Sequence, residues 1–254
     1  MADYDNRALR AAGTADTVDA GLRAYMQRVY NYMFLGLAVT GAAAYGAFLE
    51  AVTTNAATAV KVLPNGVMLT SFGVALFGPL MWVFLIGSLG LVLFLSFRIQ
   101  TMSVSTARTS FLAYAALIGV TFSSIFVVYT QGSIAEVFFI TAATFGAMSL
   151  WGYTTKTDLT SFGSFLFMGL IGIVIAMFVN FFFQNAMLQW IVSVAGVLIF
   201  TGLTAYDSQK IKENYVATDD GTVMGRKAIF GALRLYLDFI NLFLMLLRLM
   251  GNRR

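Results

Sequence analysis

Two aspartates, Asp207 and Asp238, are the residues of this sequence that could carry chemistry inside apolar segments. Asp238 interrupts the apolar run Leu235–Leu247, and Asp207 closes the preceding run at 188–206. A carboxylate in a membrane helix costs about 2.5–3.5 kcal/mol on insertion scales, so it usually has a partner or a function. Two carboxyl groups that meet resist ionising together, and they titrate as a unit. The two aspartates therefore indicate a proton-sensitive or cation-handling centre.

The two aspartates are predicted to lie in the same half of the membrane. Asp207 follows about 19 apolar residues, a rise of about 28 Å, and so lies near the cytoplasmic end of its helix. Asp238 lies eleven residues after Lys227 and enters from the same side. The simpler alternatives are an ion pair of Asp207 with Lys210 and an i, i+4 pair of Asp238 with Arg234. Neither alternative explains both acids at once.

Three further charged residues flank the apolar runs. Arg98 ends the second run on the side of the two aspartates, either as an interfacial charge or as their counter-ion. Glu50 and Glu136 lie at the outer ends of the first and fourth runs. They are interpreted first as interfacial carboxylates, and alternatively as an outer acidic vestibule that gathers cations.

Composition excludes several kinds of chemistry. Of the 254 residues, 59% are hydrophobic and 11% are charged, against roughly 25% charged in soluble domains, which indicates a polytopic membrane protein. Cysteine and histidine are absent, so thiol catalysis, iron–sulfur ligation and the usual zinc sites are excluded. Oxygen ligands suited to calcium, magnesium or protons remain. We predict no cofactor and no metal site, and the net charge of +4 gives no reason to expect nucleic acid as a partner.

Seven runs are long enough to cross a membrane, which requires about 20 apolar residues in a helix. They cover residues 31–49, 77–97, 109–129, 134–153, 162–183, 188–206 and 228–250. The sequence predicts an all-α fold with a polar tail at 1–29 and a seven-helix membrane domain at 30–254. Because the last run holds Arg234 and Asp238, we expect other helices, rather than lipid, to surround it.

Small residues recur where the predicted helices should touch. Glycine permits close approach of two helix backbones in a membrane. Glycines spaced along the first, second and fifth runs include Gly36, Gly41, Gly46, Gly87, Gly90, Gly169 and Gly172. Glycine is also common in membrane helices generally, so this pattern by itself identifies no contact.

Basic residues predict the orientation. With the amino terminus in the cytoplasm, eleven basic residues fall on the cytoplasmic side and only Lys61 on the other, which fits the positive-inside rule. The eleven are Arg7, Arg10, Arg23, Arg28, Arg98, Arg108, Lys156, Lys210, Lys212, Arg226 and Lys227. The first helix would then be an uncleaved signal anchor. Full crossing by the last run places Arg248, Arg253 and Arg254 outside, re-entry keeps them inside, and the pattern leaves both alternatives open.

The segment Leu235–Phe243, followed by Leu246–Arg248, resembles the carboxyl-terminal signature of the Bax inhibitor-1 family and its bacterial members. Three other stretches agree with this resemblance: Gly119–Ile125, Gly152–Leu159 and Ala205–Lys212. The resemblance implies seven helices with the last one central and surrounded by the other six. It also implies a pH-sensitive calcium leak in which Asp207 and Asp238 share a hydrogen bond and Arg98 engages them.

Two other functions are considered. Intramembrane aspartyl proteases also use two aspartates, but their second acid lies in Gly-x-Gly-Asp, whereas Asp238 follows Leu235-Tyr236-Leu237; no enzymatic activity is predicted. The resemblance also implies a regulatory protein that interacts with a membrane-bound AAA protease or another partner through the 1–29 tail. Lipid and calcium ions are the other expected partners, and a bacterial inner membrane is the expected location.

Overall fold

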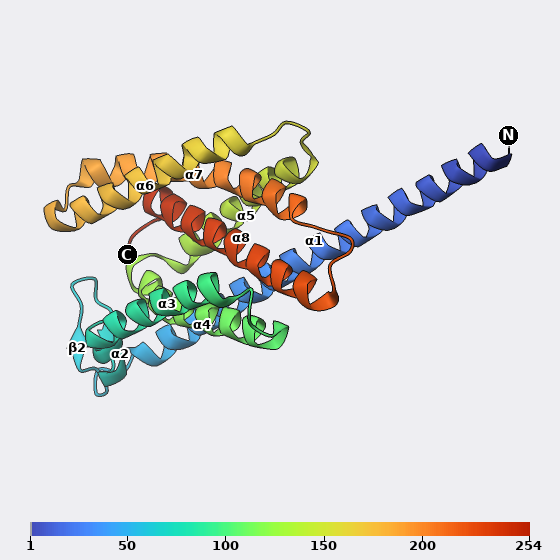
Figure 1. Ribbon diagram of the computed structural model, residues 1–254. Coiled ribbons are helices and arrows are strands. Elements are labelled where there is room, and N and C mark those ends of the chain that lie inside the picture. The colour runs from blue at the N-terminus through green and yellow to red at the C-terminus, as the bar shows by residue number, and fades with distance from the viewer. Residues whose placement is uncertain (1) are drawn as a thin grey trace.

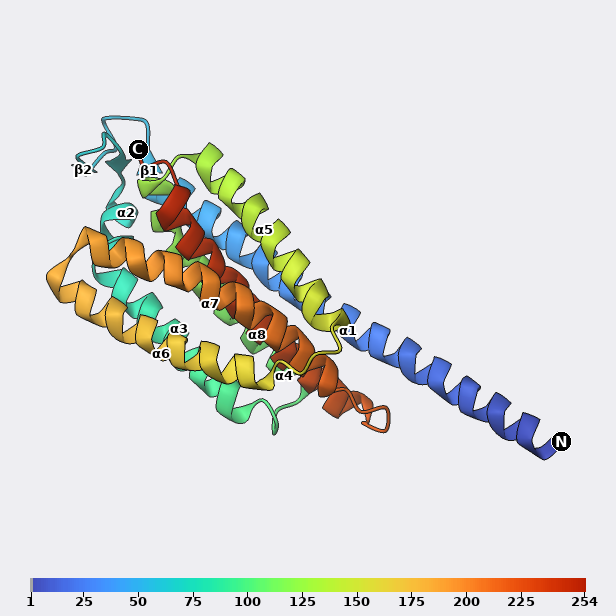
Figure 2. The same ribbon diagram turned by 90° about the horizontal axis from the view of Figure 1, so that it is seen from above.

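The computed structural model describes residues 2–254, with side chains from Ala20 onward, and shows a bundle of long helices (Figure 1, Figure 2). In this part of the chain, seven helices are long and apolar enough to cross a membrane. They are α1 (Ala2–Ala51), α3 (Pro79–Arg98), α4 (Val104–Val128), α5 (Gln131–Thr154), α6 (Thr160–Phe183), α7 (Ala186–Glu213) and α8 (Gly221–Met250). The predicted all-α polytopic fold is confirmed.

Short polar residues begin four of the membrane helices. Each of these side chains accepts a hydrogen bond from a backbone N–H in the first turn that follows, which satisfies a donor that the helix end leaves unpaired. They are Ser103, Thr130, Asn185 and Asp220. Between α6 and α7 the chain turns at Gln184, whose φ of 47° lies in the left-handed region. Because this turn is short, α6 and α7 are antiparallel neighbours.

Helix α8 is the central helix of the bundle. It packs against α1, α4, α5 and α7, and most of its residues are buried (Figure 1). The outer helices α3 and α6 pack mainly on α4 and α7 and expose most of their apolar side chains. The last helix is therefore central, as predicted, but four helices rather than six form its main packing partners.

A buried hydrogen-bonded junction joins α1, α4 and α8. The ring of Tyr236 on α8 lies edge-on to Phe111 and Tyr114 on α4. The hydroxyl of Tyr236 is 2.8 Å from Thr40 Oγ1 on α1. The hydroxyl of Thr40 donates to the carbonyl of Ala115 at 2.9 Å. A polar group in an apolar core is tolerated where its hydrogen bonds are satisfied. The junction fixes the depth and rotation of α8 relative to its neighbours.

The predicted amino-terminal boundary at residue 29 falls within helix α1. The sequence predicts a polar tail that ends at residue 29, and α1 crosses this position without a break. Two basic residues of the positive-inside count, Arg7 and Arg10, lie outside the residues whose side chains the structure describes. The division into tail and membrane domain stays a prediction.

The connection at 50–76, between the first two predicted spans, contains short regular elements. Strands β1 (Val52–Thr53), β2 (Lys61–Val62) and β3 (Met68–Leu69) form an antiparallel sheet in the order β1-β3-β2, and α2 (Ser71–Leu76) follows. Strands of two residues are too short to show an alternating pattern. These strands could therefore not be predicted from the sequence pattern.

The chain after α8 is docked against the turn between α4 and α5. The backbone N–H of Thr130 donates to the carbonyl of Asn252 at 3.0 Å, and the N–H of Arg254 donates to the carbonyl of Val128 at 2.9 Å. These bonds lie at the end of the bundle opposite the connection between α7 and α8 (Figure 1). The last helix therefore crosses the whole bundle and does not re-enter, which decides the alternative that the sequence left open.

Candidate functional site

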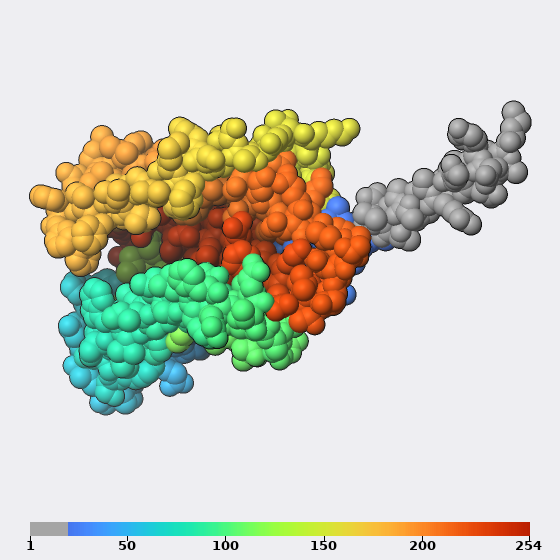
Figure 3. Space-filling model, viewed as in Figure 1, coloured from blue at the N-terminus to red at the C-terminus, as the bar shows by residue number. Residues whose placement is uncertain are grey.

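A pocket of about 690 Å³ lies between α6, α7 and α8. Its polar lining residues are Ser164, Tyr206, Asp207, Arg234, Asp238 and Asn241, and the remainder of the lining is mostly apolar. In the space-filling view the molecule is hollowed on this face, with α8 at the bottom of the hollow between α6 and α3 (Figure 3). The hollow exists because α3 and α6 pack on different neighbours and leave one side of α8 uncovered.

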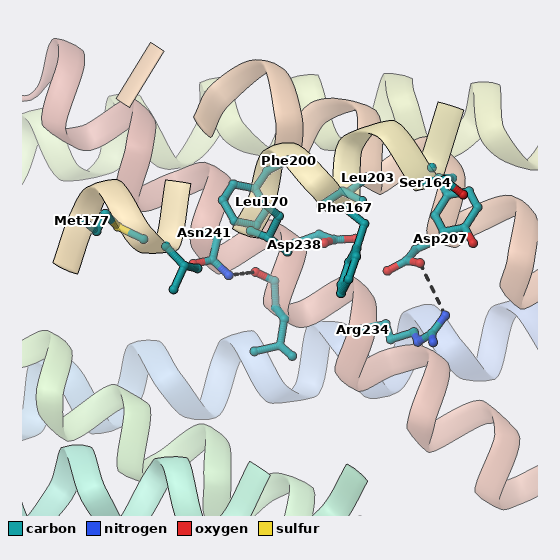
Figure 4. Close-up of a pocket in the computed structure, with 14 residues that line it drawn as sticks. Ser164, Phe167, Leu170, Met177, Phe200, Leu203, Asp207, Arg234, Asp238 and Asn241 are labelled. Atoms are coloured by element: carbon teal, nitrogen blue, oxygen red, sulfur yellow. Dashed lines mark hydrogen bonds and ion pairs between the residues drawn. The ribbon is translucent and has the colours of Figure 1, made fainter. Parts of the chain in front are cut away.

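The structure brings Asp207 and Asp238 together in this pocket (Figure 4). Asp238 is only 6% exposed, and its Oδ2 has no hydrogen-bond partner among the described residues. The two carboxyl groups project from neighbouring helices, Asp207 from α7 and Asp238 from α8, into the same pocket. A hydrogen bond between them would require one group to carry a proton, because two ionised carboxylates can only accept hydrogen bonds. The two aspartates that the sequence singled out therefore line one pocket, and a hydrogen bond between them stays a prediction.

Arg234 supplies the positive charge beside the pair. Its Nη1 lies 3.5 Å from Asp207 Oδ1 (Figure 4). Its guanidinium also lies over the ring of Phe230. Lys210 is 2.7 Å from Glu213 instead. Both simpler ion pairs that the sequence allowed are therefore replaced by one pair between neighbouring helices, Arg234 on α8 with Asp207 on α7.

The structure does not bring Arg98 to the aspartates, contrary to the expectation from the sequence. Arg98 is exposed at the end of α3, and α3 packs on α4 rather than on α7. The separation of α3 from α6 and α7 is the physical reason. Glu50 and Glu136 are exposed near the far end of the bundle and do not line the pocket. An outer acidic vestibule stays a prediction.

Asn241 is a pocket residue that the sequence analysis missed. It follows Asp238 by three residues, which places both side chains on one face of α8. Its Nδ2 donates to the carbonyl of Leu237 at 2.8 Å, which leaves the amide oxygen directed toward the pocket (Figure 4). The i, i+3 spacing of two polar residues in an apolar run was the signal that could have identified it.

A chain of three hydroxyl groups holds α7 from behind the pocket. Ser208, next to Asp207, donates to the carbonyl of Thr204 at 2.7 Å, so its only proton is used. The hydroxyl of Ser149 on α5 lies 2.8 Å from Ser208, and the hydroxyl of Tyr30 on α1 lies 2.7 Å from Ser149. Each hydroxyl therefore donates to the next, from α1 through α5 to α7. The chain fixes the rotation of α7 that turns Asp207 toward the pocket.

Comparison with known proteins shows which family this chain belongs to. The model of the family described as "Inhibitor of apoptosis-promoting Bax1" matches residues 22–254. The chain belongs to this family, the Bax inhibitor-1 family. It is 48% identical to inner membrane protein YbhL of Escherichia coli K12 over 92% of this chain and 94% of that protein. It is 42% identical to uncharacterized protein RP147 of Rickettsia prowazekii over 100% of both chains.

This member of the Bax inhibitor-1 family is a multi-pass protein of the bacterial inner membrane, as the seven apolar helices and the relative in Escherichia coli show. Its pocket offers oxygen atoms of two carboxyl groups and of the Asn241 amide. Calcium takes about six to eight oxygen ligands, so an ion in this pocket would keep much of its water. The arrangement fits weak, exchangeable contact with a hard cation better than tight binding.

Proposed function

We propose that this protein is a pH-sensitive calcium leak pathway of the bacterial inner membrane and has no enzymatic role. The observation that carries the proposal is the placement of Asp207 and Asp238 in one open pocket beside the central helix. An ionisable residue inside a membrane bundle marks an ion or proton pathway by default. Membership of the Bax inhibitor-1 family supports the same proposal.

The pocket is long enough to form a large part of such a pathway. Along α6 its lining extends from Gly163 to Met177, which are 14 residues or about 21 Å apart. The hydrocarbon core of a bilayer is about 30 Å thick. At the far end, Nη1 of Arg248 lies 3.9 Å from Met177 Sδ, so a positive charge stands where the lining ends. A calcium ion would enter from the end of the bundle that carries Asp207, the cytoplasmic end in the proposed orientation.

The gate in this proposal is the ion pair between Arg234 and Asp207. With one proton shared, the two aspartates keep one negative charge, which holds the Arg234 guanidinium at the pocket. The positive charge of the guanidinium then repels calcium. A second proton removes that charge, and Arg234, which is 41% exposed, is free to turn toward water. Acidification is therefore expected to open the pathway.

The test is calcium entry into liposomes that contain the purified protein, measured across a pH series. Flux is expected to rise from mildly alkaline to mildly acidic pH and to be absent from protein-free liposomes. If the wild-type protein passes no calcium at any pH, the leak proposal fails. The protein would then act as a regulatory partner, for example of a membrane-bound AAA protease, and co-purification would be the next measurement.

Replacing Arg234 by glutamine is expected to raise calcium flux at neutral pH by about fivefold or more. A divalent ion about 8 Å from a guanidinium is repelled by about 4 kcal/mol at an effective dielectric constant of about 20. If about 1 kcal/mol of this repulsion contributes to the barrier that calcium crosses, its removal changes the flux about fivefold. Liposome flux is the measurement, and Arg98→Gln is the matched control.

Arg98→Gln is expected to behave as the wild-type protein because Arg98 is exposed on α3, outside the pocket. The opposite result, with Arg98→Gln leaky and Arg234→Gln unchanged, would show that the gate is the one expected from the sequence.

A further inference from the structure

A second pocket, of about 490 Å³, lies on a different side of the bundle, between α1 and α5. Phe239 of α8 forms its floor, and it shares no lining residue with the pocket of the two aspartates. The pocket exists because α1 and α5 scarcely touch along their length. Its volume lies within the range of about 300–1,000 Å³ that is common for ligand pockets.

The second pocket opens sideways, toward the region that lipid occupies in a membrane. Its lining includes Phe34 on α1 and Leu150 on α5, whose side chains are 60% and 62% exposed. Large apolar side chains with this exposure on a membrane-spanning helix face lipid tails. At Gly146, between the two helices, an added Cβ would meet no atom within 4 Å. The groove is therefore open toward the lipid, and acyl chains can enter it.

The groove is polar at one end and apolar along the remainder. Arg23 and Gln27 line one end of the groove, and Met33 and Phe34, further along α1, line the apolar part. Arg23 and Phe34 are eleven residues apart, or about 16 Å along the helix. The hydroxyl of Tyr30 is already bonded to Ser149, so only its ring is offered to a ligand. A cation at the membrane interface above an apolar groove matches the two parts of a phospholipid.

We propose that this groove binds one anionic phospholipid from the leaflet at the Arg23 end of the groove. One acyl chain lies along Met33, Phe34 and Gly146, and the head-group phosphate contacts Arg23. A guanidinium binds phosphate oxygens through two parallel hydrogen bonds, which gives arginine a preference for phosphate groups. Basic pockets at the interface are known to hold anionic head groups.

Binding would also strengthen the bundle, because the walls of the groove carry the Tyr30–Ser149 hydrogen bond that joins α1 to α5. A ligand that binds only the folded protein raises its apparent stability. The melting temperature is therefore a second readout that does not depend on calcium flux.

The test uses the full-length protein, stripped of lipid by detergent exchange and titrated with phosphatidylglycerol or phosphatidylcholine. Bound lipids are counted by native mass spectrometry, and melting temperatures are recorded in parallel. The wild-type protein is expected to bind one phosphatidylglycerol about tenfold more tightly than phosphatidylcholine, a difference of about 1.4 kcal/mol. Binding of phosphatidylglycerol is also expected to raise the melting temperature.

Two variants with matched controls separate the chain and head-group contributions. Gly146→Leu fills the groove and is expected to weaken the binding of both lipids about tenfold. Gly132→Leu, on the same helix with equally open space, is expected to leave the binding of both lipids unchanged. Arg23→Gln is expected to abolish the preference for phosphatidylglycerol, and Arg28→Gln, exposed on α1 outside the groove, to retain it.

The proposal is overturned by either of two results. In the first, Gly146→Leu, with a wild-type melting temperature in the absence of lipid, still binds lipid as the wild type does. In the second, Arg23→Gln and Arg28→Gln weaken the binding of phosphatidylglycerol equally. That would indicate diffuse attraction of the lipid to a basic surface instead of binding at a site. Should Gly146→Leu fail to fold, the comparison of the two arginine variants decides.

Discussion

Asp207→Asn and Asp238→Asn are each expected to abolish the pH response of calcium flux. Asparagine has the shape of aspartate but cannot change charge, so neither variant can pass between the singly and the doubly protonated pair. In the wild-type protein we expect flux to change about tenfold over the pH series, which corresponds to about 1.4 kcal/mol. In each variant the change should fall to less than about twofold, or about 0.4 kcal/mol.

The two variants should differ in their constant level of flux. Asp207→Asn removes the charge that holds Arg234 at 3.5 Å, so its flux should be constantly high. Asp238→Asn leaves Asp207 ionised without a shared proton, so Arg234 remains bound and flux should be constantly low. Liposome flux at fixed protein density measures both levels.

Asp158→Asn is the matched control. Asp158 is exposed between α5 and α6, outside the membrane-spanning helices, and its Oδ1 accepts hydrogen bonds from the hydroxyl and the backbone N–H of Thr160. These bonds lower the pKa of Asp158 below its ordinary value. The group therefore stays ionised throughout the pH series, and its loss should leave the response intact. Wild-type pH profiles in both membrane variants would place the gate elsewhere.

Gly152→Ala is expected to lower the melting temperature more than Gly146→Ala on the same helix. A Cβ at this position would lie 2.1 Å from the carbonyl oxygen of Ala205 and 2.7 Å from its Cα. These are backbone atoms, so α5 and α7 must move apart. Overpacking of this kind costs about 1–3 kcal/mol. For a chain of this size that corresponds to roughly 2–12 °C.

The same substitution should also disturb calcium flux, because Gly152 lies one helical turn from Ser149, which bonds to Ser208 next to Asp207. Gly146→Ala, on the same helix with no atom within 4 Å of the added carbon, is the control for helix propensity. Thermal unfolding in detergent measures the effect. Equal melting temperatures for the two variants would show that the contact between α5 and α7 is looser than the structure describes.

The sequence by itself determined the features that depend on local composition. The length of each apolar run decides whether it can cross a membrane, and the seven predicted spans correspond to the seven helices within a few residues at most ends. The carboxylates Asp207 and Asp238 stood out because they interrupt or end such runs. The central position of α8 followed from the need to shield Asp238 and Arg234 from lipid.

Only the tertiary structure decided which side chains meet. Arg98 and Arg234 were both within reach of the aspartates by sequence, and the packing of α3 on α4 removed Arg98. Among the glycines, Gly152 is in close contact with a neighbouring backbone, whereas Gly41 and Gly46 have open space beside them. Contacts between helices depend on their rotation and separation. Those are set by the packing of the whole bundle, so a periodic pattern along one helix does not contain them.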